Sequence, residues 1–293
     1  MKSLLFAAIL LAAAPLALAS ASNCPAQFFS GRAPDVHNPK LARDTKPLCF
    51  DAFAVLYSGV SLTPLWSAEH ITRQRVQQAR EMVRTDTFHE EPQLQNMPHP
   101  ELADYARSGF DRGHMSPNGD MPDKDAQFQS FSLANMIPQS PENNRGLWAG
   151  LEASVRDMAV RDGEVYVVTG PLFEGSAIKR LNNRVLVPTY LYKAVYNPSK
   201  QQAAAYVTPN APGDDYQVVS IAELEKRIGI NPFPTLPEAA RQQAMRLPPP
   251  KPASSGPRAT HSRATRESSS DNAIWRWLEH EFYRMLKQLV RSL

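Results

Sequence analysis

The stretch Phe110–Met121, FDRGHMSPNGDM, concentrates ionisable side chains and turn-forming residues in twelve positions. It contains Asp111, Arg112, His114 and Asp120 together with two glycines and a proline, and it follows neither a heptad nor an alternating pattern. Gly, Pro, Asn and Asp are common in turns, so a solvated loop with an incidental histidine is one interpretation. The surrounding sequence decides whether the stretch belongs to a functional site.

A second group of polar residues follows about thirty positions later, on a predicted helix that begins near Asn143 or Asn144. Asn144, Glu152 and Arg156 are spaced at multiples of four and therefore share one polar side of this helix. The opposite side is apolar, with residues every three or four positions, Leu147, Leu151, Val155 and Met158. An amide, a carboxylate and a guanidinium beside a histidine suit a site for a hard divalent cation and a phosphate.

Each of these residues also has an ordinary structural interpretation. An asparagine at a helix start is commonly an N-cap, and a Glu and an Arg four positions apart commonly form a surface pair. A single histidine is often inert. The sequence around the motifs therefore matters more than any one residue.

Runs of apolar and β-branched residues on both sides of these motifs predict strands. They lie at residues 50–57, 63–71, 164–170 and 185–196, and residues 74–83 predict a short polar helix. The chain is 42% hydrophobic, which is enough for a substantial core. We therefore expect one α+β domain over residues 22–245, with a mixed or antiparallel central β-sheet flanked by helices.

Residues 1–21 have the features of a secretory signal peptide. Lys2 precedes an apolar run, and the small residues around Ala19 suit cleavage. A membrane anchor is the alternative, but Pro15 interrupts the run, which is shorter than the roughly 20 residues that a membrane span needs. We expect an exported protein, either periplasmic or secreted.

The chain has two cysteines, Cys24 and Cys49, and both remain after cleavage of the signal peptide. An oxidising compartment allows them to form a disulfide, and no C-x-x-C pattern suggests zinc. Loss of Lys2 with the signal lowers the formal charge from +3 to +2 (3 − 1 = 2). Any binding of anions must therefore depend on a local patch and not on the net charge.

The composition changes after Met245. Residues 246–271 are rich in Pro, Ser and Arg and predict a disordered linker. Residues 272–293 then have apolar side chains at helical spacing and predict an amphipathic C-terminal helix. This helix either packs on its own domain or on a second subunit, or it binds a membrane surface or a partner protein.

The motifs together resemble those of the DNA/RNA non-specific endonuclease family, which are nucleases of the ββα-metal (His-Me finger) kind. The resemblance covers about residues 50–211. It rests on the order DRGH, N-x-x-P-Q, N-x-x-x-W-x-x-L-E and T-G-P along the chain. It implies a fold with a ββα-metal motif, in which the histidine ends a β-hairpin and the asparagine lies on the helix that crosses beneath it.

The resemblance also implies a role for each residue. His114 is expected to be the general base that activates water, Asn144 the single direct protein ligand of Mg²⁺, and Glu152 the residue that holds metal-bound water. Asp111 is expected to support the site, and Arg112 to lie near the phosphate.

The same resemblance places further polar residues around the site. Asn135 and Gln139 are expected to line it, and Arg84 and Arg156 to contact phosphate. Arg80 is the alternative to Arg84.

The sequence therefore predicts an exported, Mg²⁺-dependent endonuclease that hydrolyses phosphodiester bonds in DNA and RNA. The resemblance implies that its products carry 5′-phosphates. Mn²⁺ is expected to substitute for Mg²⁺, and a homodimer is left open. Two alternatives remain. One is a catalytically silent nucleic-acid- or partner-binding module on the same fold, and the other is a phosphodiesterase that acts on substrates other than nucleic acids.

Overall fold

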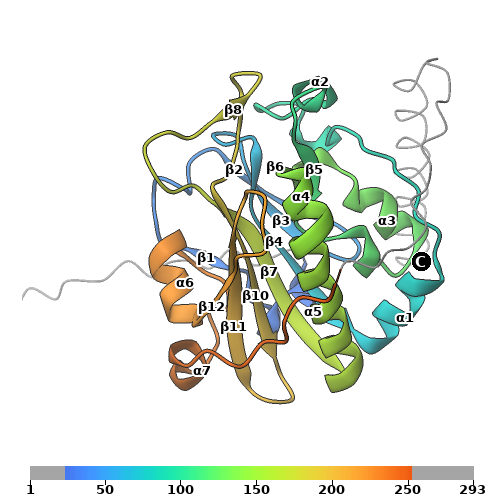
Figure 1. Ribbon diagram of the computed structural model, residues 1–293, viewed down its shortest axis with the longest axis vertical. Coiled ribbons are helices and arrows are strands. Elements are labelled where there is room, and N and C mark those ends of the chain that lie inside the picture. Colours follow the sequence, from blue (N-terminus) through green and yellow to red (C-terminus); the bar gives the residue numbers. More distant parts are fainter. Residues whose placement is uncertain (1–23, 253–293) are drawn as a thin grey trace, which may run out of the picture.

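A seven-stranded antiparallel sheet forms the centre of the computed structural model, which describes residues 24–252 (Figure 1). The order of its strands is β12-β11-β10-β7-β4-β3-β2. From one edge to the other these strands are Gln217–Val219, Gln202–Pro209, Tyr190–Asn197, Glu164–Leu172, Thr63–Thr72, Ala54–Ser58 and Thr45–Cys49. The predicted α+β class with an antiparallel central sheet is confirmed.

Three smaller strand pairs accompany the sheet. They are β1 (Asp35–Val36) with β13 (Ile230–Asn231), β5 (Asp111–His114) with β6 (Met136–Gln139), and β8 (Arg180–Leu181) with β9 (Val185–Leu186). All three pairs are antiparallel.

Helices cover both faces of the sheet (Figure 1). The α-helices are α1 (Arg73–Glu81), α2 (Leu102–Tyr105), α3 (Lys124–Ser130), α4 (Pro141–Asn143), α5 (Ala149–Asp162), α6 (Ile221–Ile228) and α7 (Glu238–Gln242). The short 3₁₀ turns are η1 (Pro25–Gln27), η2 (Phe29–Gly31), η3 (Pro92–Leu94), η4 (Asn118–Asp120) and η5 (Leu133–Asn135), and η6 (Asn144–Trp148) is a π-helical segment. No helix among residues 24–252 is long and apolar enough to cross a bilayer.

The two faces of the sheet have separate cores, because successive side chains of a strand point in opposite directions. In β10, Tyr192 and Ala194 pack on the α6 side, whereas Leu191 and Val195 pack on the α5 side. The same alternation places Lys193 on the α5 side. This face carries the candidate site, and the α6 face closes the opposite layer.

Two of the predicted strands have different limits in the structure. Residues 50–53 form the turn between β2 and β3, in which the amide of Phe50 bonds to the carbonyl of Phe53, so the strand starts at Ala54. Residues 185–196 do not form one strand, because the chain leaves the β8–β9 pair and enters the sheet only at Tyr190, two residues beyond Pro188. Proline lacks the N–H that a continuous ladder requires.

A disulfide joins Cys24 to Cys49, as predicted, with the two Cα atoms 5.7 Å apart. It fastens the first described residue to the end of β2. The loop that it closes spans 25 positions of sequence.

Removal of this disulfide is expected to weaken the fold without changing the site. The double substitution Cys24→Ser with Cys49→Ser should lower the free energy of unfolding by roughly 3 kcal/mol, since the unfolded chain regains loop entropy. Urea unfolding measures this loss, and the reduced wild type should match the variant. Equal urea midpoints for oxidised wild type and the variant would contradict it.

Residues 246–252, which the sequence assigned to the disordered linker, are ordered. They cross the sheet from α7 towards α5 (Figure 1). We call residues 245–252 the strap. The reason for its order is hydrogen bonding: the Tyr206 hydroxyl donates to the carbonyl of Pro248 at 2.6 Å and the Ser154 hydroxyl to that of Pro249 at 2.7 Å.

Gly150 makes room for the strap. A Cβ atom at this position would lie 2.3 Å from the carbonyl oxygen of Lys251, so only glycine permits the approach. The amide of Lys251 in turn donates to the Gly150 carbonyl at 3.1 Å. The predicted signal peptide, the remainder of the linker and the C-terminal helix, residues 1–21 and 253–293, lie outside the described residues.

Candidate active site

The strands β5 and β6 and the helical segment that follows them form one ββα unit. Asp111 pairs with Gln139 and His114 with Met136 across the two strands. The chain then turns at Ser140 into α4, η6 and α5, so His114 and Asn144 come from adjoining parts of the unit. A Cβ at Gly113 would lie 2.0 Å from Oε1 of Gln139, which explains the glycine of the DRGH motif.

His114 is enclosed by aromatic rings. Its imidazole centroid lies 4.9 Å from that of Phe131 and 5.7 Å from that of Phe88. The side chain is 9% exposed, and its Nε2 atom has no hydrogen-bond partner among the described residues. Burial, assisted by the charges of Arg84 and Arg112, lowers the pKa of His114 to about 3. The imidazole is therefore neutral at pH 7, which is the form that a general base requires.

This low pKa predicts a loss of stability in acid. The unfolded state takes up a proton on the histidine near pH 6.5 whereas the folded state does not, so stability should fall as the pH falls from about 6.5 towards 3. The contribution of this group is at most about 1.4 kcal/mol per pH unit. Urea midpoints at pH 7.0, 5.5 and 4.5, without metal, should show a smaller acid loss for His114→Gln than for wild type. Parallel losses would contradict the assignment.

Two arginines lie against the rings that enclose His114. The guanidinium of Arg112 is 4.0 Å from the centroid of Phe88, and that of Arg84 is 5.4 Å from the centroid of Phe131. Arg84 also donates to the Asp86 carboxylate at 2.6 Å. Two cations beside a neutral base form an arrangement that can bind a phosphate next to the proton acceptor.

Asp111 orients Asn144. Its Oδ2 atom accepts a hydrogen bond from Nδ2 of Asn144 at 2.9 Å and another from Nε of Arg145 at 2.8 Å. The amide nitrogen of Asn144 is thereby occupied, and none of the hydrogen bonds between described residues uses its Oδ1 atom. Arg145 was not identified from the sequence, and its position beside Asn144 is the only signal that could have indicated it.

Asn144 lies close to the strand that ends at His114. Its partner Asp111 is the first residue of β5 and His114 is the last, and three residues of extended chain span about 10 Å between Cα atoms. Arg84 lies beside Phe131, the ring that packs on His114, and donates to Oδ1 of Asn118 at 3.4 Å in the loop that follows His114.

The side chains present fit a hydrated hard cation better than a tightly ligated metal. No group of three or more His, Cys, Asp or Glu residues within residues 24–252 could hold a metal ion by itself. The free amide oxygen of Asn144 is the type of donor that Mg²⁺ accepts, and Mg²⁺ usually keeps several of its waters. Asn144 would hold the ion, with Glu152 placed two turns along the helix.

Glu152 and Arg156 continue the same side of α5. Arg156 donates to Oδ1 of Asp120 at 2.9 Å, and Asp120 belongs to the stretch Phe110–Met121. The loop after His114 is therefore attached to the helix. Burial raises the pKa of Glu152, and the charges of Lys193 and Arg156 oppose the shift.

Asn135 and Gln139 are both fully buried. The amide of Asn135 donates to the carbonyls of Ser116 and Ser130 at 2.8 and 2.9 Å, and its Oδ1 accepts from the Ser116 amide. Gln139 donates to Oδ1 of Asn143 at 2.8 Å. Both residues therefore lie in the interior of the ββα unit, where they hold the loop after His114 and the start of the helix.

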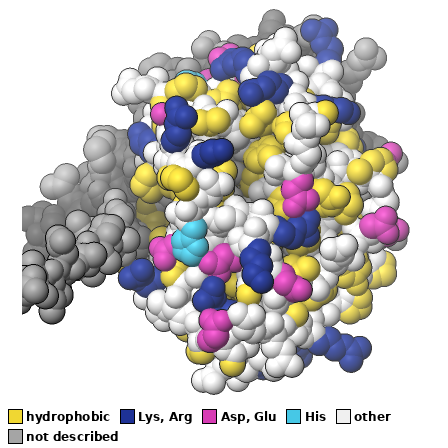
Figure 2. Space-filling model, turned by 90° about the vertical axis from the view of Figure 1, so that its left-hand side faces the viewer, with side chains coloured by type: hydrophobic (Ala, Val, Ile, Leu, Met, Phe, Trp, Pro, Cys, Tyr) yellow, Lys and Arg dark blue, Asp and Glu magenta, His cyan; other side chains and the backbone are white. Residues whose placement is uncertain are grey.

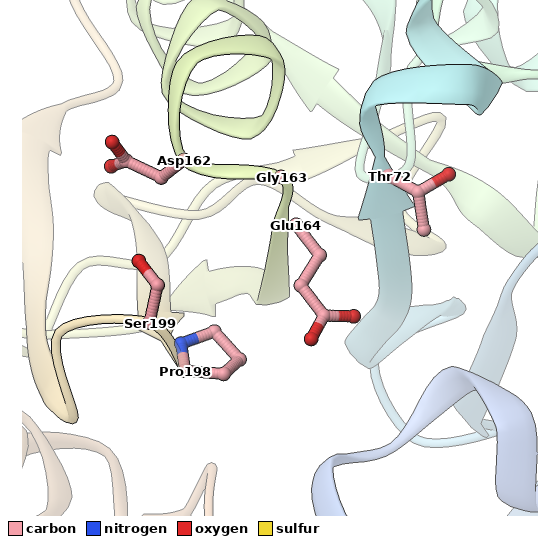
Figure 3. A pocket seen from close by; sticks show the side chains of 6 residues that line it. All are labelled: Thr72, Asp162, Gly163, Glu164, Pro198 and Ser199. Carbon is pink, nitrogen blue, oxygen red and sulfur yellow. The ribbon is translucent and has the colours of Figure 1, made fainter.

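A shallow hollow of about 430 Å³ lies at the far end of α5 (Figure 3). The Asp162 and Glu164 side chains at its edge point apart, and both are engaged, Asp162 with Arg161 and Glu164 with His70. None of the predicted site residues lines it. On the α6 side of the molecule, acidic and basic side chains are intermixed (Figure 2).

Comparison with known proteins gives a family match over most of the described chain. The sequence profile of the DNA/RNA non-specific endonuclease family matches residues 34–239. The zebrafish (Danio rerio) protein named mitochondrial nuclease EXOG is 34% identical over 203 residues, which are 61% of this chain and 58% of that protein. The chain thus matches little more than half of that relative's length.

Two further similarities are more extensive. The Xenopus laevis protein of the same name is 32% identical over 75% of this chain and 71% of its own, and nuclease C1 of Cunninghamella echinulata var. echinulata is 34% identical over 68% and 86%. Among solved structures, the crystal structure of the EndoG/EndoGI complex, which addresses EndoG inhibition, contains a similar chain. Its TM-score is 0.56 at 27% identity, covering 63% of this chain and 84% of that chain.

Proposed function

Because the chain belongs to the DNA/RNA non-specific endonuclease family, we propose that it hydrolyses phosphodiester bonds in DNA and RNA with the aid of Mg²⁺. The observation that carries this proposal is the neutral imidazole of His114, enclosed by two rings and flanked by two arginines. It stands on the strand whose first residue orients Asn144.

His114 supplies the base in the proposed reaction. The imidazole takes a proton from the attacking water, for which its neutral form is required. The negative charge of a phosphate bound beside Arg84 and Arg112 would offset these two cations and raise the pKa of His114 towards the working pH. Arg84 and Arg112 bind the non-bridging oxygens and offset the negative charge that develops on them. Asn144 would hold the ion through its carbonyl oxygen, and Glu152 would orient a water beside it. When bound, Mg²⁺ supplies Lewis-acid stabilisation of the leaving oxygen.

The proposed contacts reach phosphate and not base edges. Such contacts carry no sequence information, so cleavage should be largely indifferent to sequence and sugar. Binding should weaken as salt rises, because neutralised phosphates release counterions. The net charge of +3 is small, so affinity depends on the arginines of the site.

A plasmid-nicking assay tests the proposal. Purified protein with Mg²⁺ should convert supercoiled DNA to nicked and linear forms and should degrade a structured RNA, and EDTA should stop both reactions. End-labelling should succeed only after phosphatase treatment, which identifies 5′-phosphates. A binding module would retard DNA without cutting it, and a phosphodiesterase for other substrates would cleave bis(p-nitrophenyl) phosphate alone. Either result would overturn the endonuclease proposal.

We further propose that the protein is exported. Support comes from the apolar leader and from the Cys24–Cys49 disulfide, since disulfides persist mainly in oxidising compartments. Several relatives are named mitochondrial, but mitochondrial presequences are Arg-rich, and the first arginine of this chain is Arg32. The intact mass of the purified protein should correspond to a chain that begins near residue 20 or 22. A mass that includes Met1 would contradict export by cleavage.

A further inference from the structure

Six charged residues from β4, α1, η4, α5 and β10 form a group on the α5 side of the sheet. Three are carboxylates and three are cations, and they are Glu69, Asp120, Glu152, Arg75, Arg156 and Lys193. Glu69, Asp120, Arg75 and Lys193 are buried, whereas Glu152 and Arg156 are half-buried. Charges withdrawn from water are costly unless each one has a partner. Their pairing can therefore be followed residue by residue.

Four of the six form two direct ion pairs. Arg75 bonds to Oε2 of Glu69 at 2.9 Å, and Arg156 bonds to Oδ1 of Asp120 at 2.9 Å. Burial and the nearby Asp120 raise the pKa of Glu69, and Arg75 is the main charge that opposes the rise. Lys193 and Glu152 are the two members of the group that remain.

Lys193 lies in the interior. It comes from the middle of β10, and the residue is 1% exposed. Its ammonium donates to the hydroxyl of Thr169 at 2.8 Å and lies 5.0 Å from the centroid of the Trp148 ring. Within the part of the chain that the structure describes, it has no carboxylate within ion-pair distance.

Trp148 connects Lys193 with the turn of helix that carries Glu152, since its ring lies 5.0 Å from the ammonium. Trp148 and Glu152 are four positions apart and therefore adjacent on the same side of the helix. The Glu152 carboxylate takes part in none of the hydrogen bonds or ion pairs between residues 24 and 252. Burial raises the pKa of Glu152, and the charge of Lys193 is the main one that opposes this rise. The sheet register agrees with this arrangement, because Lys193 pairs with Thr169 and its side chain faces α5.

We propose that Lys193 is a positioning residue, whose buried ammonium is the counter-charge that holds the Glu152 carboxylate towards the water around the metal ion. The proposal rests on the proposed function, because it assigns Lys193 an action through a residue of that site. Without this cation, Glu152 faces the carboxylates of Glu69 and Asp120 and loses its strongest attraction. Lys193 itself does not contact the substrate.

The test is a double-mutant cycle between positions 193 and 152. Lys193→Met should weaken Mn²⁺ binding by about 10–100-fold, as for other residues that orient a metal's surroundings. Calorimetry on metal-free protein, without nucleic acid, measures this binding. The same substitution should lower kcat by about 10–100-fold. In a Glu152→Gln background the same substitution should change both values by less than about twofold, since coupled residues are not additive. Lys200→Met is the matched control: Lys200 pairs with Asp162 at the far end of α5, and both values should stay at the wild-type level.

Thr169→Val separates charge from hydrogen bonding, and it should leave Mn²⁺ binding nearly unchanged because the ammonium remains. Thermal unfolding gives a second measurement if Lys193→Met folds poorly. The double variant with Glu152→Gln should then melt at a higher temperature than Lys193→Met alone, because the carboxylate that repels Glu69 and Asp120 is gone.

Equal losses in the two backgrounds, or wild-type Mn²⁺ binding in Lys193→Met, would overturn the proposal. A double variant that melts no higher than Lys193→Met would also overturn it. If wild-type protein binds Mn²⁺ but cuts no nucleic acid, the proposed function fails, and the Mn²⁺ cycle still decides the role of Lys193.

Discussion

Replacing His114 with alanine lowers kcat/KM on plasmid DNA by about 10²–10⁴-fold, the usual effect of losing a general base. The imidazole is the only histidine side chain of the ββα unit, and its enclosure by Phe88 and Phe131 keeps it neutral. Initial rates of supercoil loss at saturating Mg²⁺ measure the effect. The apparent affinity for DNA should change little, because the arginines that meet phosphate remain.

A matched substitution distinguishes chemistry from folding. His37 pairs with Glu225 on the α6 side of the molecule, far from β5, and His37→Ala should cleave at the wild-type rate. Circular dichroism should show folded protein for both variants. A folded His114→Ala protein with wild-type kcat would remove the histidine from the reaction and leave the proposed mechanism without a base.

Replacing Asn144 with alanine should reduce cleavage on the order of 10³-fold, because the loss of metal stabilisation is worth several kcal/mol. The variant would lack the Oδ1 atom that is proposed to bind the ion, and the Asp111 carboxylate would lose one of its hydrogen-bond partners. The Mg²⁺ concentration for half-maximal activity should also rise. Calorimetry with Mn²⁺ measures the same loss without any turnover.

The control for this variant is Asn38→Ala. Asn38 lies in the turn beside Gly229, on the opposite side of the sheet, where its Oδ1 accepts from the amide of Lys40. The affinity of the Asn38→Ala variant for Mn²⁺ should equal that of the wild type. Unchanged Mn²⁺ binding in Asn144→Ala would show that the ion is held elsewhere.

The sequence predicted the parts of the fold that depend on local pattern. The strand at 63–71 and the helix at 74–83 agree with β4 and α1 within one or two residues, because apolar periodicity and the Thr72 cap are local signals. The strand at 185–196 was too long, since apolar residues before and after Pro188 are equally suited to strands. Only the tertiary structure assigns them to different sheets.

In the candidate site, too, the sequence indicated residues with local signals but not those whose role depends on tertiary contacts. Residue types and spacing indicated His114 and Asn144, but no pattern could show that Asp111 turns the Asn144 amide or that two rings enclose His114. Lys193 escaped notice because it lies within an apolar strand far from the motifs. Asn135 and Gln139 were predicted from the sequence to line the site, and no pattern could show that Asn135 bonds to the backbone of Ser116 or that Gln139 bonds to the side chain of Asn143.

The strap extends the domain beyond the segment that the family profile matches, which ends at residue 239. Its carbonyls and amides bond to Ser154 and Gly150, which lie on the same helix as Glu152. A protein cut back to the matched segment would therefore lose a brace of that helix, together with the cover over Tyr206. A truncated protein whose activity is to be compared with that of its relatives should therefore extend at least to residue 252.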